Sequence, residues 1–198
     1  IQKIEVIDYE DLKSLVDYEA LKQFKDNALN PEHPVLRGTA QNSDIYFQGR
    51  EAANKYYEAI PDIVNDYMGE ISKITGREYK PFNYYGSSDA TNVIVAMGSV
   101  CDTAKLVVED LVSKGEKIGL IEVHLYRPFS PYYLKNVLPN TVERIAVLDR
   151  TKEAGSIGEP LYLDVISVLS DTNIKVVGGR YGLSSKNTTP DQIYAVYE

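Results

Sequence analysis

The sequence predicts an α/β fold, in which a three-layer domain with a mostly parallel sheet is preceded by a mainly helical and loop segment. From residue 91 onward, short apolar runs alternate with amphipathic stretches of helical length. The apolar runs are nearly continuous, which is typical of strands buried on both faces of a parallel sheet. The first 80 residues instead combine helical periodicity with one long irregular stretch.

The beginning of the chain is predicted to form helices joined by a long loop. Ile4 and Val6 look like the end of a strand, and acidic residues at positions 8–11 then supply a cap and negative charge for a helix start. Residues 30–49 show no periodicity and contain prolines, glycines and many amides, which is typical of a loop. Loops of this length are uncommon inside compact folds, so we expect this one to lie across another surface.

A firm helix is predicted to follow this loop. Its apolar residues recur at helical spacing and form one stripe: Ile60, Ile63, Val64, Tyr67, Ile71 and Ile74. Pro61 suits the opening turn of this helix, and Gly76 suits its end. Residues 80–82 and 86–89 are then predicted to form a connector.

Four strands are predicted in the second half of the chain, at residues 92–97, 118–123, 145–148 and 174–177. Helices separate and follow them, and Ser130 and Thr189 each precede a proline, as an N-cap residue often does. Strands that alternate with helices pair in parallel through right-handed crossovers. The sequence therefore predicts a three-layer domain from about residue 87 to residue 198.

Composition excludes several classes of function. The 198 residues are 43% apolar, which is enough for a packed core and too much for a disordered protein. A net charge of −8 argues against a nucleic-acid partner, which needs a basic face. The single cysteine, Cys101, excludes an internal disulfide framework and fits a reducing cytoplasm. No apolar run approaches the roughly 20 residues of a membrane helix. Because the chain begins at Ile1, we expect it to be processed or cut from a longer polypeptide.

Two glycine turns could bind an anion. Gly98 leads from the first strand into a helix N-terminus, but the G-x-G-x-x-G pattern is absent and Asp102 would repel a phosphate. Gly178 and Gly179 follow the fourth strand, and Arg180 could supply the charge. In both places the favoured interpretation is structural: a tight turn in the first, and an exit from a crowded sheet edge in the second.

The cysteine and the histidines give weak signals for catalysis. Cys101 stands near a buried strand end, where a small residue usually serves packing. His124 and Glu122 share one face of the second strand, so the carboxylate could orient the imidazole as a general base, although any strand yields such pairs. His33 lies in a separate segment, and these residues do not match the spacing of a metal site.

Charged residues at the carboxyl ends of two strands are candidates for a cleft. Arg127 follows the second strand, and Asp149, Arg150 and Lys152 end or follow the third. Open α/β sheets bind ligands at this edge, but a salt-bridge patch between domains needs the same residue types. Both interpretations stay open. Tyrosine pairs at positions 56–57, 84–85 and 132–133 favour contacts with other domains, because tyrosine suits half-buried interfaces.

The order of these motifs resembles one enzyme family. A strand followed by Gly98-Ser99, a strand ending in Arg127-Pro128-Phe129 and a strand ending in Asp149-Arg150 resemble the C-terminal domain of the transketolase and 2-oxoacid dehydrogenase superfamily. Residues 36–51 are similar to the linker of pyruvate:ferredoxin (or flavodoxin) oxidoreductases. Further segments resemble that family in the same order: 76–77, 84–86, 96–99, 125–129, 148–153 and 178–183.

The resemblance covers essentially the whole chain and implies how it is divided. Residues 1–80 would be the tail of a preceding thiamine-binding-type domain, with helices and a long linker. Residues 81–198 would be a transketolase C-terminal-like, Rossmann-like α/β domain. Interface or cleft-edge candidates then lie at the linker and at the strand ends: Arg37, Arg127, Asp149, Arg150, Lys152 and Arg180.

The resemblance also implies the chemistry of the parent enzyme. Such enzymes oxidatively decarboxylate pyruvate, transfer the acetyl group to coenzyme A, and pass electrons through [4Fe–4S] clusters to ferredoxin or flavodoxin. The superfamily holds thiamine diphosphate and magnesium with a Gly-Asp-Gly motif, and each cluster takes four cysteines. This sequence has no Gly-Asp-Gly motif and one cysteine. We therefore expect the chain to bind no cofactor itself and to be catalytically incompetent alone.

In that family the second domain is mainly structural and helps to form the subunit interface. The implied partners are other domains of the parent chain and a second subunit, and no catalytic, cofactor-binding or metal-binding residue is assigned. Three alternatives remain: an oxidoreductase for another 2-oxoacid, a free-standing nucleotide-binding module that uses Gly98 and Gly178-Gly179, and a pure interaction module.

Overall fold

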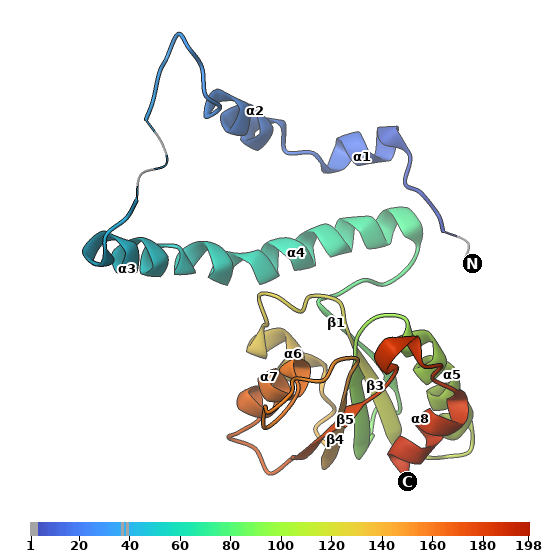
Figure 1. Cartoon of the computed structure of the whole chain (residues 1–198). Helices are drawn as coiled ribbons and strands as arrows, with labels where there is room; N and C mark the ends of the chain where they lie inside the picture. The colour runs from blue at the N-terminus through green and yellow to red at the C-terminus, as the bar shows by residue number, and fades with distance from the viewer. Residues whose placement is uncertain (1–3, 37, 39) are drawn as a thin grey trace. The chain divides into compact units, whose positions relative to one another are not determined.

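The chain divides into two compact units, Ile1–Glu78 and Tyr79–Glu198, called here the helical unit and the α/β unit (Figure 1). The computed structural model describes residues 4–36, 38 and 40–198. Within this part of the chain, no helix is both long enough and apolar enough to cross a membrane.

A five-stranded sheet forms the middle of the α/β unit. Its strands lie in the order β1-β3-β2-β4-β5, and β2, β3, β4 and β5 run parallel. Their bounds are Phe82–Gly86 for β1, Asn92–Ala96 for β2, Ile118–Val123 for β3, Arg144–Asp149 for β4 and Lys175–Arg180 for β5. The predicted α/β class with a mostly parallel sheet is confirmed.

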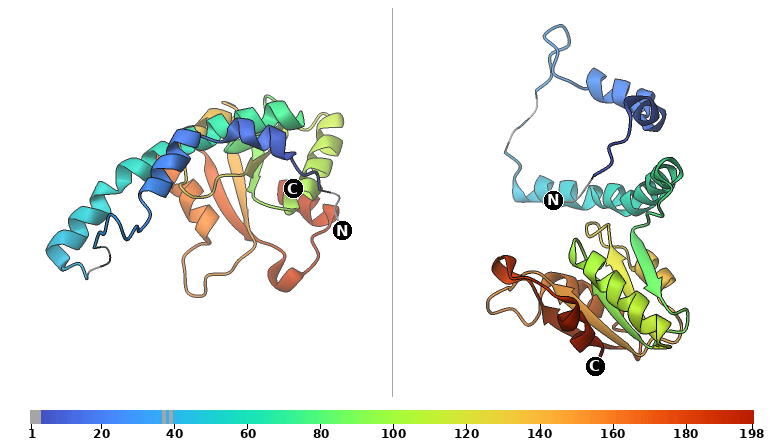
Figure 2. Two further views of the ribbon diagram at one scale, coloured as in Figure 1. Left: turned by 90° about the horizontal axis from the view of Figure 1, so that it is seen from above. Right: turned by 90° about the vertical axis from the view of Figure 1, so that its right-hand side faces the viewer.

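Helices cover both faces of this sheet and complete three layers (Figure 1). One face packs against α5 (Val100–Ser113) and α8 (Pro190–Tyr197), and the other packs against α6 (Pro131–Val137) and α7 (Pro160–Val168). A short 3₁₀ turn, η1 (Leu183–Ser185), lies between β5 and α8. The same layers are seen from two further directions in Figure 2. Alternate residues of β2 enter opposite cores: Val93 and Val95 on the α6 and α7 side, and Ile94 and Ala96 on the α5 and α8 side.

The helix starts predicted from proline follow the expected chemistry. The Ser130 hydroxyl accepts a hydrogen bond from the Tyr133 N–H at 3.4 Å, and Pro131 occupies the first turn of α6. Thr189 and Gln192 form a capping box at the start of α8. These local devices explain why the helix positions could be read from the sequence.

The strand β1 differs from the expectation, since the sequence predicts a connector in this region. It pairs antiparallel with β3, from Phe82 opposite Val123 to Gly86 opposite Gly119. The polar and aromatic sequence Asn83-Tyr84-Tyr85 lacks the continuous apolar run of the parallel strands. Tyr84 lies over Gly119, where a Cβ would meet the tyrosine hydroxyl at 2.3 Å, so this pairing depends on a glycine in the neighbouring strand.

The helical unit contains four helices among its described residues: α1 (Tyr9–Leu15), α2 (Tyr18–Asp26), α3 (Ser43–Ala52) and α4 (Asn54–Thr75). Three expectations for this unit were wrong. Residues 4–6 are not in a strand, and α3 occupies part of the predicted loop. Because α4 begins at Asn54, Pro61 lies inside the helix rather than in its opening turn. Gly76 does end α4, with a left-handed φ of 69°.

The described residues of the helical unit bury only Pro61, whereas the α/β unit has two apolar cores. Apolar burial supplies most of the free energy that opposes local opening. We therefore expect backbone amides of α1, α2 and α4 to exchange with solvent orders of magnitude faster than those of β2, β3 and β4. Hydrogen exchange of the whole chain, followed by mass spectrometry, measures both units in one sample. Equal protection of α4 and β3 would contradict this prediction.

Candidate functional site

The carboxyl ends of the parallel strands meet at one edge of the sheet in the α/β unit. The chain moves from β2 to one neighbour, β3, and reaches the other neighbour, β4, through α6 on the opposite face. The order of the strands therefore reverses between β2 and β4, which is where open α/β sheets place their ligands. Asp149 ends β4, and its register partner Arg180 ends β5.

Asp149 is 1% exposed and is used to start a helix. Its two carboxylate oxygens accept hydrogen bonds from the N–H groups of Leu161 at 3.0 Å and Tyr162 at 3.1 Å, in the first turn of α7. The cap of α7 thus comes from a neighbouring strand. Burial raises the pKa of the Asp149 carboxyl, and the two backbone N–H groups oppose that rise. Because each carboxylate oxygen of Asp149 accepts one of these two hydrogen bonds, both oxygens already have a partner within the domain.

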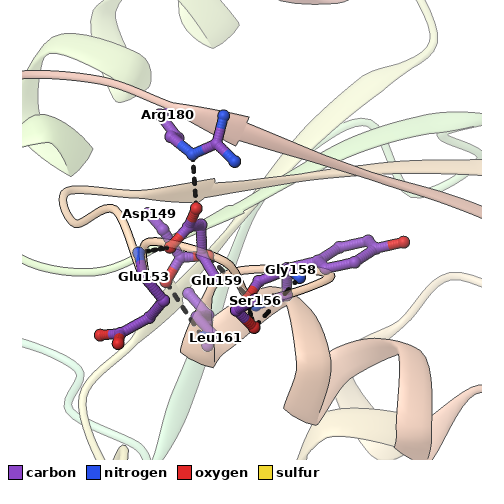
Figure 3. Close-up of polar contacts among 8 residues, drawn as sticks. Asp149, Glu153, Ser156, Gly158, Glu159, Leu161 and Arg180 are labelled. Carbon is purple, nitrogen blue, oxygen red and sulfur yellow. Dashed lines mark hydrogen bonds and ion pairs between the residues drawn. The ribbon is translucent and has the colours of Figure 1, made fainter.

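Glu159 forms a second buried carboxylate beside Asp149, and Figure 3 shows it between Arg180 and the loop that precedes α7. Its side chain is 5% exposed and is ion-paired with the Arg180 guanidinium. It also accepts a hydrogen bond from the Glu153 N–H at 2.7 Å. Arg180 lowers the pKa of the Glu159 carboxyl, with further help from the Glu153 N–H. Glu159 therefore ties β5 to the loop between β4 and α7.

Sequence reasoning missed Glu159, although one signal was available. It directly precedes Pro160, the first residue of α7, and acidic residues are favoured near helix N-termini. Its role as a partner of Arg180 depends on the pairing of β4 with β5, which no local pattern reports. The adjacent turn is fixed by Ser156, whose hydroxyl donates to the Gly158 carbonyl at 2.8 Å.

Arg150 faces the loop that follows β5. Its Nε–H donates to the Gly182 carbonyl at 3.1 Å, and Nη2 lies 3.5 Å from the Ser185 hydroxyl. A polar pocket of about 230 Å³ lies beside it, between the start of α5 and the loop after β5. Ser99, Thr103 and Lys186 contribute to its lining. Residues that follow β2, β4 and β5 therefore line one pocket, at the edge where the strand order reverses between β2 and β4.

Arg127 forms its contacts apart from Glu159 and Arg180, and Lys152 acts on Glu159 through its charge, which helps to lower the pKa of that carboxyl. Arg127 lies 2.7 Å from the Asp164 carboxylate of α7, and its guanidinium stacks 3.9 Å from the ring centre of Tyr126. Lys152 is exposed. Arg37 lies outside the described residues. The structure thus places Asp149 and Arg180 opposite each other in neighbouring strands, joins Arg180 to Glu159, and places Arg150 and Arg127 in separate contacts.

The glycine pair after Val177 serves close packing. A Cβ on Gly178 would meet Tyr162 at 3.0 Å, and a Cβ on Gly179 would meet Leu148 at 2.9 Å. Both glycines therefore let side chains of α7 and β4 approach the backbone of β5. The pair lies inside β5 rather than after it, so the predicted exit from the sheet edge is wrong; the glycines serve packing within the sheet instead.

The chemistry of the side chains does not fit a metal or cluster site in the described part of the chain. No group of three or more His, Cys, Asp or Glu side chains there is placed to hold a metal ion. Cys101 is buried in the α5 core, and burial raises the pKa of its thiol to about 12, with the Glu122 charge adding to that rise. A [4Fe–4S] cluster requires four thiolates, and one buried thiol cannot supply them.

Two protein-family models match the chain. The model "Pyruvate:ferredoxin oxidoreductase core domain II" matches residues 90–193, and "Pyruvate flavodoxin/ferredoxin oxidoreductase, thiamine diP-bdg" matches residues 1–69. Over the whole of this chain, the identity is 56% with a pyruvate-flavodoxin oxidoreductase of Enterobacter agglomerans and 58% with a pyruvate:ferredoxin oxidoreductase of Moorella thermoacetica. The chain spans 17% of the length of each relative.

The chain is also similar to a solved structure described as "Split gene transketolase, inactive beta4 tetramer". The identity is 18% and the TM-score is 0.43, over 62% of this chain and 39% of that one.

Proposed function

Since this chain belongs to the pyruvate:ferredoxin oxidoreductase family, we propose that it is a structural and interface module of such an enzyme. The parent enzyme would oxidatively decarboxylate pyruvate with coenzyme A to acetyl-CoA and CO₂, and would reduce ferredoxin or flavodoxin. The observation that carries this proposal is the match of two models of this family, in order, to residues 1–69 and 90–193. The relatives at 56% and 58% identity are both named for pyruvate, which favours this substrate over another 2-oxoacid.

The proposed division assigns residues 1–80 to the end of a thiamine-binding-type domain and residues 81–198 to the α/β domain. The absence of a core among the described residues of the helical unit supports the first assignment, because such helices need another surface to bury their apolar side chains. Phe24, Leu29 and Ile45 are more than half exposed. We infer that in the parent these side chains pack against the rest of the thiamine-binding domain.

A structural role for the α/β domain is supported by how its charged residues are used. At the carboxyl edge of the sheet, Asp149 caps α7, Glu159 pairs with Arg180, and Arg127 pairs with Asp164. Each charge thus has a partner inside the domain. A carboxylate that acts on a substrate needs hydrogen-bonding capacity facing the substrate, and Asp149 and Glu159 use theirs within the fold.

The cofactors of the parent would be held outside this chain. Thiamine diphosphate and magnesium would bind in the thiamine-binding domains, and [4Fe–4S] clusters would bind in a cysteine-rich part of the polypeptide. The proposed partners of this chain are the other domains of the parent and a second subunit, and the proposed compartment is the cytoplasm.

Titration calorimetry tests this proposal directly. We expect the 198-residue chain to release no binding heat with thiamine diphosphate and Mg²⁺ at micromolar concentrations, and to reduce no dye in the presence of pyruvate and coenzyme A. A full-length pyruvate:ferredoxin oxidoreductase serves as the positive control under the same conditions. Saturable micromolar binding, or turnover by the chain alone, would contradict the structural role.

A further inference from the structure

His124 lies where the chain enters the α/β unit, and each of its ring nitrogens faces an acceptor. Nδ1 is 2.9 Å from the carbonyl oxygen of Lys80, which precedes β1. Nε2 is 3.4 Å from the Glu122 carboxylate on β3. The His124 side chain is 24% exposed and the Glu122 side chain is 12% exposed, so both contacts are partly shielded from water.

Two acceptors determine which form of the ring fits this place. A neutral imidazole carries one N–H and one lone pair, so one of its nitrogens would face an acceptor with a lone pair. The imidazolium carries two N–H groups and satisfies both. Glu122 stays ionised because Lys105 Nζ lies 2.7 Å from it. Burial opposes that ionisation, but the hydrogen bonds from His124 and Lys105 lower the pKa of Glu122 to about 2.

The backbone of His124 also binds residues 80–81, the segment that precedes β1. The N–H groups of His124 and Leu125 both donate to the Pro81 carbonyl, at 3.0 and 3.1 Å. The His124 side chain adds the neighbouring carbonyl, that of Lys80. The backbone and the side chain of His124 therefore bind two consecutive carbonyl groups, those of Pro81 and Lys80, at the end of β3.

We propose that His124 is a pH-dependent clamp: its imidazolium joins the Lys80 carbonyl to the Glu122 carboxylate, and loss of one ring proton loosens the entry segment, residues 79–81. This inference goes beyond the scaffold function. It assigns the α/β unit a proton-sensitive fastening of its own first residues, 79–81.

The groups around the ring set the sign of the pH dependence. The hydrogen bond to Glu122 raises the pKa of His124, burial opposes the rise, and the Lys80 carbonyl supports it. The positive charge of Lys105 on α5 lowers the pKa of His124. The ammonium group of Lys105 lies 4.4 Å from the ring centre of Tyr85 on β1. Tyr79 places its ring 6.0 Å from the imidazole. A raised pKa in the folded state means that the clamp is closed at and below about pH 6.5, the ordinary histidine value, and opens as the pH rises through the folded pKa.

Nuclear magnetic resonance of the whole chain tests the clamp, because His33 and His124 are its two histidines. We expect the ring ¹⁵N shifts of His124 to be those of an imidazolium at pH 6.5 and to titrate above that value. Replacement of Glu122 with Gln should lower the midpoint. Exchange of the His124 and Leu125 amides, corrected for its intrinsic pH dependence, should rise about tenfold across the His124 titration.

Matched variants separate the clamp from general effects of pH. His124→Gln should remove the pH step in amide opening, and His33→Gln should leave it unchanged. The ¹⁵N titration of the unsubstituted chain needs no variant, so it decides the matter even if Glu122→Gln or His124→Gln fails to fold. A neutral His124 ring at pH 6.5, or the same pH step in the His124→Gln chain, would overturn the proposal.

Discussion

Replacement of Gly86 with Ala is expected to destabilise the α/β unit by about 3 kcal/mol. Gly86 has a φ of 132°, which side-chain-bearing residues rarely adopt, and a Cβ there would meet the Ile118 carbonyl oxygen at 2.4 Å. That oxygen also accepts a hydrogen bond from the Ser87 N–H at 2.9 Å. The clash is with backbone, so the end of β1 must move away from β3 and lose this bond. Urea unfolding, followed through the tyrosine signal of the chain, measures the loss.

Gly115→Ala is the matched control for Gly86→Ala. Gly115 also has a left-handed φ, of 90°, but no atom lies within 4 Å of the position of its Cβ. The Gly115→Ala substitution should therefore lower the stability only by the backbone strain, about 1 kcal/mol. If the two variants lose the same stability, the close approach of β1 to β3 contributes nothing and the expected result is wrong.

Replacement of Asp149 with Ala should cost about 2–3 kcal/mol. The substitution removes both acceptors for the N–H groups of Leu161 and Tyr162, and it leaves the first of these groups buried and the second partly buried at the start of α7. Hydrogen bonds to a charged acceptor are among the stronger ones in proteins. The same urea titration measures the loss, and hydrogen exchange should show opening of the first turn of α7 before that of α5.

Two further substitutions test the role of Asp149 as a cap. Asp149→Asn keeps one acceptor oxygen, so the stability of this variant should lie between that of the unsubstituted chain and that of Asp149→Ala. Asp171→Ala removes an exposed carboxylate that pairs with Lys135, and its effect should be within the error of the measurement. A loss from Asp149→Ala as small as that from Asp171→Ala would show that the α7 cap is dispensable.

Elements that depend on neighbouring residues in the sequence could be predicted, and elements that depend on distant partners could not. The predicted strands and helix starts depended on local patterns: continuous apolar runs in β2 and β3, and proline after Ser130 or Thr189. The strand β1 has no such pattern, because it pairs antiparallel at the sheet edge and packs Tyr84 over Gly119. The helix α3 differs from the expectation because its polar residues and Gly49 are typical of a loop.

The candidate site shows the same division. Asp149, Arg150 and Arg180 could be named from their position at strand ends, since parallel strands bring such ends to one edge. Their partners could not. Glu159 reaches Arg180 across 21 residues, and His124 reaches the Lys80 carbonyl across 44. The sequence therefore places charged residues at this edge, but it does not indicate whether their partner is a ligand or a neighbouring element of the fold.

The order of residues along this chain was enough to give its family, its alternation of strands and helices, and its lack of cysteine ligands for a cluster, because each follows from composition or from contacts between near neighbours. The pairing of β1 with β3, the capping of α7 by Asp149 and the two acceptors of His124 appeared only in three dimensions. They depend on which strands become neighbours, and that choice comes from burying two apolar cores at once, on both faces of one sheet.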